Sequence, residues 1–304
     1  MPIVPITPPQ PVAISSGFDY VTVDAERRRV YAAHTGSQTL LIVNADSGQE
    51  IGQVQTGPSH GVAVNPETGH VYTGDGEART VSEVDPIAQK VLATTDVAGN
   101  VDAIAYDPVE HRIYADEDDG TRMFVIDSRT MKSVGTVALP GHKPEYLAID
   151  PQSHKIYQNI ANLSEFVVID PKRLTVVQTI KTPGIANNHP LQLDTDLRHI
   201  YVGGRHDANS GILQTYDMDG NLLGQTNYAG RFDQCDVDSR THNLYCAGDG
   251  AITVFHDSGK QTTIVARYPT HEDTYTVAVD KKTGTFWTVW AGKVGDFIQG
   301  FVLK

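Results

Sequence analysis

The stretch YVTVDAERRRVY, residues 20–31, contains the unit that decides the fold. An apolar run leads to Asp24, a short polar segment follows, and Val30 and Tyr31 begin a second apolar run. Polar turn formers between two apolar runs predict two antiparallel strands joined by a hairpin. The pattern recurs at residues 61–72 as GVAVNPETGHVY and at residues 190–201 as PLQLDTDLRHIY.

Seven copies of this unit follow one another in fixed register. In each copy an aromatic residue stands seven positions after an Asp or Asn. The polar anchors are Asp24, Asn65, Asp107, Asp150, Asp194, Asp238 and Asp280. Their aromatic partners are Tyr31, Tyr72, Tyr114, Tyr157, Tyr201, Tyr245 and Trp287. Successive polar anchors lie 41 to 44 residues apart, a period typical of propeller blades, so we expect the anchors to be structural.

A single blade of this length cannot bury both of its faces, but blades stacked radially can. We therefore predict an all-β, seven-bladed β-propeller with four-stranded antiparallel blades, in one domain over residues 1–304. The blades are expected near residues 18–57, 58–99, 100–142, 143–186, 187–231, 232–271 and 272–304. A β-sandwich is the alternative fold, but it does not explain a fixed repeat.

The last repeat lacks an outer strand. The N-terminal segment, residues 1–17, is expected to supply it, with Pro11–Ser15 as the strand that closes the ring and protects the final sheet edge. Two cysteines, Cys235 and Cys246, fall on adjacent strands of the sixth blade. We expect buried free thiols, with a cross-strand disulfide as the alternative.

Composition excludes several classes of function. A formal net charge of −13 argues against a nucleic-acid backbone as the main partner. The sequence contains no apolar run long enough to span a bilayer and no Gly-rich phosphate loop. Its first ten residues lack the features of a signal peptide, so we expect a cytoplasmic protein, although a processed periplasmic or secreted protein with an added Met would look the same.

The Asp-to-Tyr register, with pairs such as Val30-Tyr31, Val71-Tyr72, Ile113-Tyr114, Ile156-Tyr157 and Ile200-Tyr201, resembles the YVTN family of β-propeller repeat proteins. The resemblance covers essentially the whole chain and implies the propeller fold. It implies little about function, because propellers host many unrelated activities.

Polar residues gather at one position of the repeat, five residues before each polar anchor. In a propeller this position begins the inner strand, near the central axis on one face. It is occupied by Asp19, His60, Asp102, Glu145, His189, Asp233 and Tyr275. Two residues later the repeat is apolar, which confines the charge to the strand starts. We predict a ring of carboxylates and imidazoles at one mouth of the channel.

The strand after each hairpin ends on the same face and adds an outer set of residues. This set comprises His34, Asp75, Glu117, Asn159, Arg205, His206 and Asp249. The following acidic segment, Asp116 to Gly120, does not fit the EF-hand spacing and is expected to be a solvated loop, with a contribution to the channel mouth as the alternative.

Converging carboxylates need a countercharge, and a divalent cation is the simplest one. The expected ligands are Asp19, His60, Asp102, Glu145, His189 and Asp233. Carboxylates with imidazoles suit Zn²⁺, Mn²⁺ or Fe²⁺, whereas carboxylates with water suit Ca²⁺ or Mg²⁺. Two alternatives stay open: internal pairing with Lys143, Arg205 and Arg231, or a solvated channel mouth that binds no ion.

The placement of this ring is also similar to that in propellers of the regucalcin and gluconolactonase type. There, residues at inner-strand starts hold a divalent metal. The resemblance implies Asp19, Glu145 and Asp233 as the matching carboxylates, and a lactone-type ester as the substrate.

The leading hypothesis is a metal-dependent small-molecule hydrolase or lyase at the channel mouth, with a metal-polarised carbonyl or activated water. Candidate catalytic residues are His60, His189, Glu145 and Tyr275, since imidazole and carboxylate serve as general bases. The alternative is a non-catalytic binding module for a protein partner. A third possibility, a polysaccharide lyase or cyclase, would use Tyr275, Arg205 or Arg231. We expect a monomer.

Overall fold

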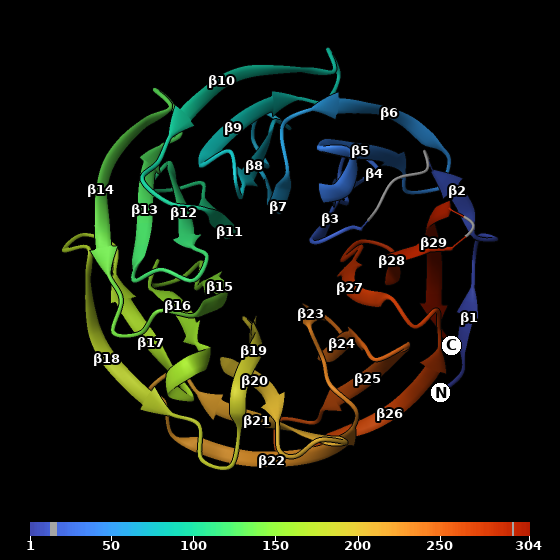
Figure 1. Ribbon diagram of the computed structural model, residues 1–304. Coiled ribbons are helices and arrows are strands. Elements are labelled where there is room, and N and C mark those ends of the chain that lie inside the picture. Colours follow the sequence, from blue (N-terminus) through green and yellow to red (C-terminus); the bar gives the residue numbers. More distant parts are fainter. Residues whose placement is uncertain (13–16, 294) are drawn as a thin grey trace.

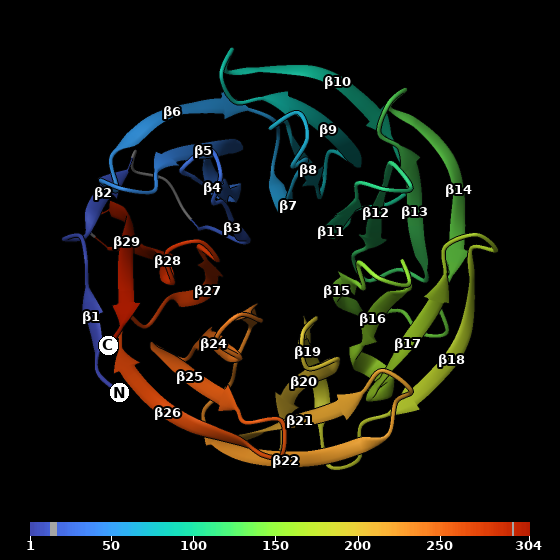
Figure 2. The same ribbon diagram turned by 180° about the vertical axis from the view of Figure 1, so that it is seen from behind.

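Seven antiparallel sheets surround a central axis in the computed structural model, which describes residues 1–12, 17–293 and 295–304. Figures 1 and 2 show the ring from its two faces, with one inner strand of each blade beside the axis. Six sheets have four strands, and the seventh combines strands from both ends of the chain. The predicted all-β, seven-bladed propeller is therefore confirmed.

Each blade runs in chain order from its inner to its outer strand, except that the outermost strands of blade 7 come from the N-terminal segment. Blades 1 and 2 comprise β3 (Val21–Asp24), β4 (Arg29–His34), β5 (Thr39–Asn44), β6 (Glu50–Gln55), β7 (Ser59–Val64), β8 (Val71–Asp75), β9 (Thr80–Asp85) and β10 (Lys90–Asp96). Blades 3 and 4 comprise β11 (Val101–Asp107), β12 (Arg112–Glu117), β13 (Arg122–Asp127), β14 (Lys132–Ala138), β15 (Pro144–Ile149), β16 (Ile156–Ile160), β17 (Glu165–Asp170) and β18 (Thr175–Lys181).

The remaining blades follow the same order. Blades 5 and 6 comprise β19 (Ala186–Asp194), β20 (His199–Arg205), β21 (Ser210–Asp217), β22 (Leu222–Ala229), β23 (Gln234–Asp238), β24 (Asn243–Gly248), β25 (Ala251–Asp257) and β26 (Thr262–Pro269). Blade 7 comprises β27 (Thr274–Val279), β28 (Thr285–Gly292) and β29 (Gly295–Leu303), with β1 (Ile3–Pro5) and β2 (Gln10–Val12). The helices of the described residues are the short 3₁₀ turns η1 (Thr35–Ser37) and η2 (Ala161–Leu163), and neither could cross a membrane.

The repeated anchors do what their residue types predict. Asn65 accepts a hydrogen bond from the Glu67 backbone N–H at 3.0 Å, and Asp280 accepts one from that of Lys282 at 3.0 Å. Side chains that cap a turn in this way fix the hairpin between inner and second strands. The aromatic partners are at most 2% exposed and pack between neighbouring blades, as Tyr31 does against blade 2.

Ring closure by the N-terminal segment is confirmed, and it uses two strands instead of the one expected. The strands β1 and β2 both pair antiparallel with β29. The expected strand Pro11–Ser15 begins correctly, since Pro11 and Val12 belong to β2, and its residues 13–15 lie outside the described part. Two short strands cover the final sheet edge.

The expectation of free thiols is wrong. Cys235 on β23 and Cys246 on β24 form a disulfide, with their Cα atoms 4.1 Å apart. The two residues are directly opposite each other in the antiparallel pair. Both are buried, so burial was predicted correctly and the oxidation state was not.

Candidate functional site

The predicted ring residues lie at or directly before the inner strands, as the repeat register requires. The structure divides them into two clusters around His60 and His189, which we call the His60 half and the His189 half. The three inner strands of each half, β3, β7 and β11 or β15, β19 and β23, are neighbours around the axis (Figure 1). Tyr275 belongs to neither half, because no hydrogen bond or ion pair joins it to either cluster among the described residues.

The His60 half joins three successive blades. His60 Nδ1 lies 2.5 Å from Asp19 Oδ2 and 3.9 Å from Asp102 Oδ1. The ligand atoms of these three residues all lie within 4.8 Å of one another, and this is the single group of three with that property in the described part of the chain. Burial opposes the charge on His60, but the Asp19 hydrogen bond and the nearby carboxylates raise its pKa to about 9.

The His189 half is held by more hydrogen bonds. His189 Nε2 lies 2.9 Å from Glu145 Oε2 and 3.4 Å from Asp233 Oδ1, while Nδ1 lies 2.8 Å from the Asp233 carbonyl oxygen. Asn159 donates to the carbonyl oxygen of His189 at 2.8 Å and fixes the strand. Despite burial, Glu145 and Asp233 raise the pKa of His189 to about 9. Both imidazoles are therefore imidazolium near neutral pH.

Negative charge is in surplus between the halves. Burial and the charges of Asp19 and Glu145 hold the pKa of Asp102 well above its ordinary value. Asp116 on β12 is fully buried, and burial together with Asp102 raises its pKa as well. Asp116 accepts hydrogen bonds from the Ala103 backbone N–H at 2.8 Å and from Gln158 Nε2 at 3.0 Å. More carboxylates than imidazoles thus share this region.

Asp116 is the residue that sequence reasoning missed, because the segment Asp116 to Gly120 was expected to be solvated. The expectation fails for Asp116 and Glu117, which are buried, and holds for the exposed Asp118 and Asp119. The repeat contained a signal that could have identified Asp116. The position two residues after each aromatic partner is Ala, Gly or Val in five blades, and its exceptions are Asp116 and Asn159.

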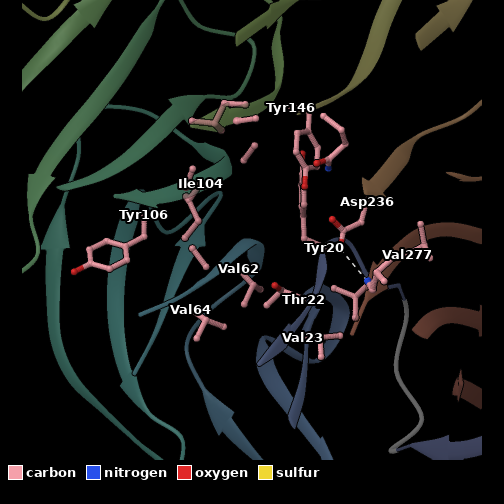
Figure 3. A pocket seen from close by; sticks show the side chains of 18 of the residues that line it. Tyr20, Thr22, Val23, Val62, Val64, Ile104, Tyr106, Tyr146, Asp236 and Val277 are labelled. Atoms are coloured by element: carbon pink, nitrogen blue, oxygen red, sulfur yellow. Dashed lines mark hydrogen bonds between the residues drawn. The ribbon is translucent and has the colours of Figure 1, made fainter. Parts of the chain in front are cut away.

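The channel is crossed by two tyrosines below the mouth. Tyr20, which directly precedes β3, and Tyr146 on β15 point toward one another, with their ring centroids 5.7 Å apart (Figure 3). A cavity of about 400 Å³ begins at these rings and continues toward Asp236 and Lys281. The residues of the two halves do not line it, so the mouth and the lower cavity are separate spaces.

The outer set of predicted residues does not come together in one site. His34 is buried 2.6 Å from Asp296 and stacks on Phe18, between blades 1 and 7. Hydroxyl groups, including Ser59 Oγ at 2.8 Å, donate to the buried Asp75. These residues stabilise contacts within and between blades.

The other members of the outer set differ in their surroundings. Glu117 pairs with Arg122, which lowers the pKa of that carboxyl. His206 is exposed and contacts the Gly184 carbonyl oxygen at 3.1 Å. Asn159, Arg205 and Asp249 lie at or beside the His189 half, and Asp249 accepts a 2.6 Å hydrogen bond from the Arg231 backbone N–H.

No protein-family model matches this chain, and no curated protein matches it by sequence. Solved structures share its fold. Hydrazine synthase of Kuenenia stuttgartiensis superposes with a TM-score of 0.83 at 15% identity, over 95% of this chain and 96% of that chain. U3-55K gives a TM-score of 0.81 at 9% identity over 99% and 98% of the two chains. The WD40 repeats of RRP9 give 0.81 at 9% identity over 99% of each. These likenesses establish the propeller fold alone.

Proposed function

We propose that the protein is a divalent-metal-dependent enzyme that hydrolyses or cleaves small molecules at the channel mouth. The observation that carries the proposal is the convergence of Asp19, His60 and Asp102, whose ligand atoms lie within 4.8 Å of one another. Two carboxylates with one imidazole form a donor set that suits Zn²⁺, Mn²⁺ or Fe²⁺ better than Ca²⁺ or Mg²⁺.

The electrostatics of the His60 half support a cation. The raised pKa of Asp102 reflects burial next to other carboxylates, and a bound cation would relieve both costs. The Tyr20 hydroxyl is buried without a hydrogen-bond partner within residues 1–12, 17–293 and 295–304. Asp102 and Asp19 contribute to the raised pKa of that hydroxyl, which places it in the field of the same carboxylates.

The two halves would have different roles. On release of the His60 proton, Asp19, His60 and Asp102 would hold a metal, which would supply Lewis-acid polarisation of a carbonyl or activation of a water. His189, bonded to Glu145, would move a proton to or from the substrate, as a carboxylate-oriented imidazole does. Asn159 would act as a positioning residue, since it holds the His189 backbone. A lactone or related ester is the substrate class that we propose to test first.

Metal titration of chelator-treated protein tests the proposal. We expect Zn²⁺ or Mn²⁺ to bind at about one ion per chain by calorimetry. Asp102→Asn should weaken binding by at least about tenfold, because it removes a charged ligand. The matched control is Asp233→Asn in the His189 half, which should leave the affinity within about threefold of wild type.

Activity is tested on the same proteins with a panel of lactones and carboxylic esters. Turnover that EDTA removes, that Zn²⁺ or Mn²⁺ restores, and that Asp102→Asn abolishes would support the enzyme. Wild-type protein that binds neither ion more tightly than Asp102→Asn would overturn it.

A non-catalytic binding module is the second candidate. The observation in its favour is that His60 and His189 each pair with a carboxylate, so part of the negative charge of the mouth is balanced without an ion. The structures of U3-55K and of the RRP9 WD40 repeats share only the fold with this chain, at 9% identity each, so they favour neither candidate. Absence of metal binding, together with a protein partner recovered at a defined rim, would favour this candidate.

A further inference from the structure

A cavity of about 350 Å³ adjoins the His189 half. It is lined by three cations and by the members of that half: Lys143, Arg205, Arg231, Glu145, His189 and Asp233. A second cavity, of about 270 Å³, shares Arg205 and Arg231 with it. We propose that this cavity binds the anionic group, a carboxylate or a phosphate, of a small-molecule substrate. The inference rests on the proposed function, because it names the substrate class of the same mouth.

Two of the three cations of this cavity form no ion pair within the described residues, and the third, Arg231, forms only a long one. Within the described residues, Lys143 and Arg205 form no ion pair with a carboxylate. Arg231 Nε is buried and has no hydrogen-bond acceptor there, and Asp249 Oδ1 lies 3.9 Å from it, beyond hydrogen-bond reach. A buried donor without an acceptor costs free energy that an incoming oxyanion would recover. The internal pairing considered as an alternative to a cation is thus largely absent.

The carboxylates that line the same cavity are already engaged. Glu145 and Asp233 both face His189, at 2.9 and 3.4 Å from Nε2. Two carboxylates line the second cavity. Asp207 accepts hydrogen bonds from the backbone N–H groups of Asn209 and Ser210, each at 2.8 Å, and Asp249 accepts one from that of Arg231 at 2.6 Å. The repulsion of these carboxylates toward an anion is therefore reduced. Lys143, Arg205 and Arg231 then give the cavity beside His189 a positive net charge.

The geometry of Arg231 favours recognition of a planar or tetrahedral oxyanion. Its guanidinium lies over the Tyr275 ring, 5.8 Å from the centroid, which limits its orientations. An arginine fork binds carboxylate and phosphate oxygens in pairs. Arg205, at the end of β20, lines both cavities together with Arg231. A substrate anchored here would extend toward the His60 half across the mouth.

Anion binding is tested on metal-free protein by calorimetry at low ionic strength, with malonate and inorganic phosphate as probes. We expect saturable binding of at least one probe, and the tighter probe identifies the anionic group. Arg205→Gln and Arg231→Gln should each weaken binding by at least about fivefold, since charge-assisted hydrogen bonds are lost. The matched control is Arg267→Gln, which removes an equal charge from an exposed position on the outer strand β26.

The outcomes separate this inference from the proposed function. Absence of saturable binding by wild type, or equal weakening by Arg205→Gln and Arg267→Gln, overturns the anion site even if Zn²⁺ or Mn²⁺ still binds. Retained anion binding in a protein that binds no metal overturns the proposed function and leaves the anion site standing. Circular dichroism of each variant confirms that its fold is intact, and Arg205→Gln, at an exposed position, keeps the test valid if Arg231→Gln does not fold.

Discussion

The His60 half and the His189 half occupy the same register position of the repeat, yet they have different surroundings. Both place an imidazole against carboxylates, and in both the pKa of the imidazole rises to about 9. The His60 half contains the three-residue ligand group and faces the further carboxylate of Asp118. The His189 half has both ring nitrogens engaged and borders a rim of cations.

The difference shows how a propeller acquires two chemistries from one repeat. The register fixes where the inner strands begin, which brings the polar residues to one face. The loops and second strands then decide the local charge, with Asp116 behind one half and Lys143 and Arg205 beside the other. Variants in each half therefore separate the effect of the shared repeat register on stability and binding from the effect of the neighbouring charged residues.

The largest expected effect is on stability between pH 6.5 and 9. The folded-state pKa values of His60 and His189 lie above the ordinary 6.5, so protonation favours the folded state. Their contribution is fully present below pH 6.5 and is lost as the pH rises through 9. A rise of the pKa from 6.5 to about 9 corresponds to at most about 3 kcal/mol for each imidazole. The raised pKa values of Asp102 and Asp233 act in the same direction at lower pH.

Urea denaturation of metal-free protein at pH 6.5 and pH 9 measures this loss. His60→Gln and His189→Gln should each flatten the pH dependence. His189→Gln should cost more stability at pH 6.5, because His189 is bonded through both ring nitrogens and His60 through one. Equal stability of wild type at both pH values would contradict the assignment of two imidazolium groups.

The next largest effect on stability is expected from removing the disulfide. It joins β23, the strand directly after Asp233, to β24. Cys235 and Cys246 enclose a loop with a sequence separation of 11. Replacing both by Ser should lower the free energy of unfolding by about 2 to 3 kcal/mol in the chain-entropy account. Thermal unfolding of the double variant measures it, with wild type under reducing conditions as the comparison. A melting temperature unchanged in both would contradict a stabilising disulfide.

Sequence reasoning predicted the blade count and the ring because both depend on fixed spacing. The division of the ring into halves depends on side-chain directions and on Asp116, which is buried where the Ala103 backbone N–H and Gln158 donate to it. The oxidation state of Cys235 and Cys246 needed the exact strand register, which sets their Cα atoms 4.1 Å apart. The lack of an ion pair at Lys143 and Arg205 in the described part of the chain likewise depends on which carboxylates reach these side chains.

A methyl group at Gly76 should disturb the His60 half without removing a ligand. A Cβ atom built there would lie 2.7 Å from His60 Nε2 and Cδ2, so the imidazole must move from its position in the ligand group. Gly76→Ala should therefore weaken Zn²⁺ or Mn²⁺ binding by about tenfold, equivalent to about 1.4 kcal/mol. Calorimetric titration measures this, and malonate or phosphate binding in the His189 half should stay unchanged. Equal loss of metal and anion binding would contradict the independence of the two halves.

The smallest expected effect concerns the Tyr20 hydroxyl below the His60 half. It is buried without a hydrogen-bond partner in the described part of the chain, and an unsatisfied buried hydroxyl contributes nothing favourable to folding. Tyr20→Phe keeps the ring that packs against Tyr146, so metal-free protein should be as stable as wild type or more stable by less than about 1 kcal/mol. Urea denaturation with and without Zn²⁺ measures the difference. A variant less stable by more than about 1 kcal/mol without metal would mean that the hydroxyl has a partner in the folded state. A loss confined to the metal-loaded protein would instead place the hydroxyl beside the bound ion and assign it to the His60 half.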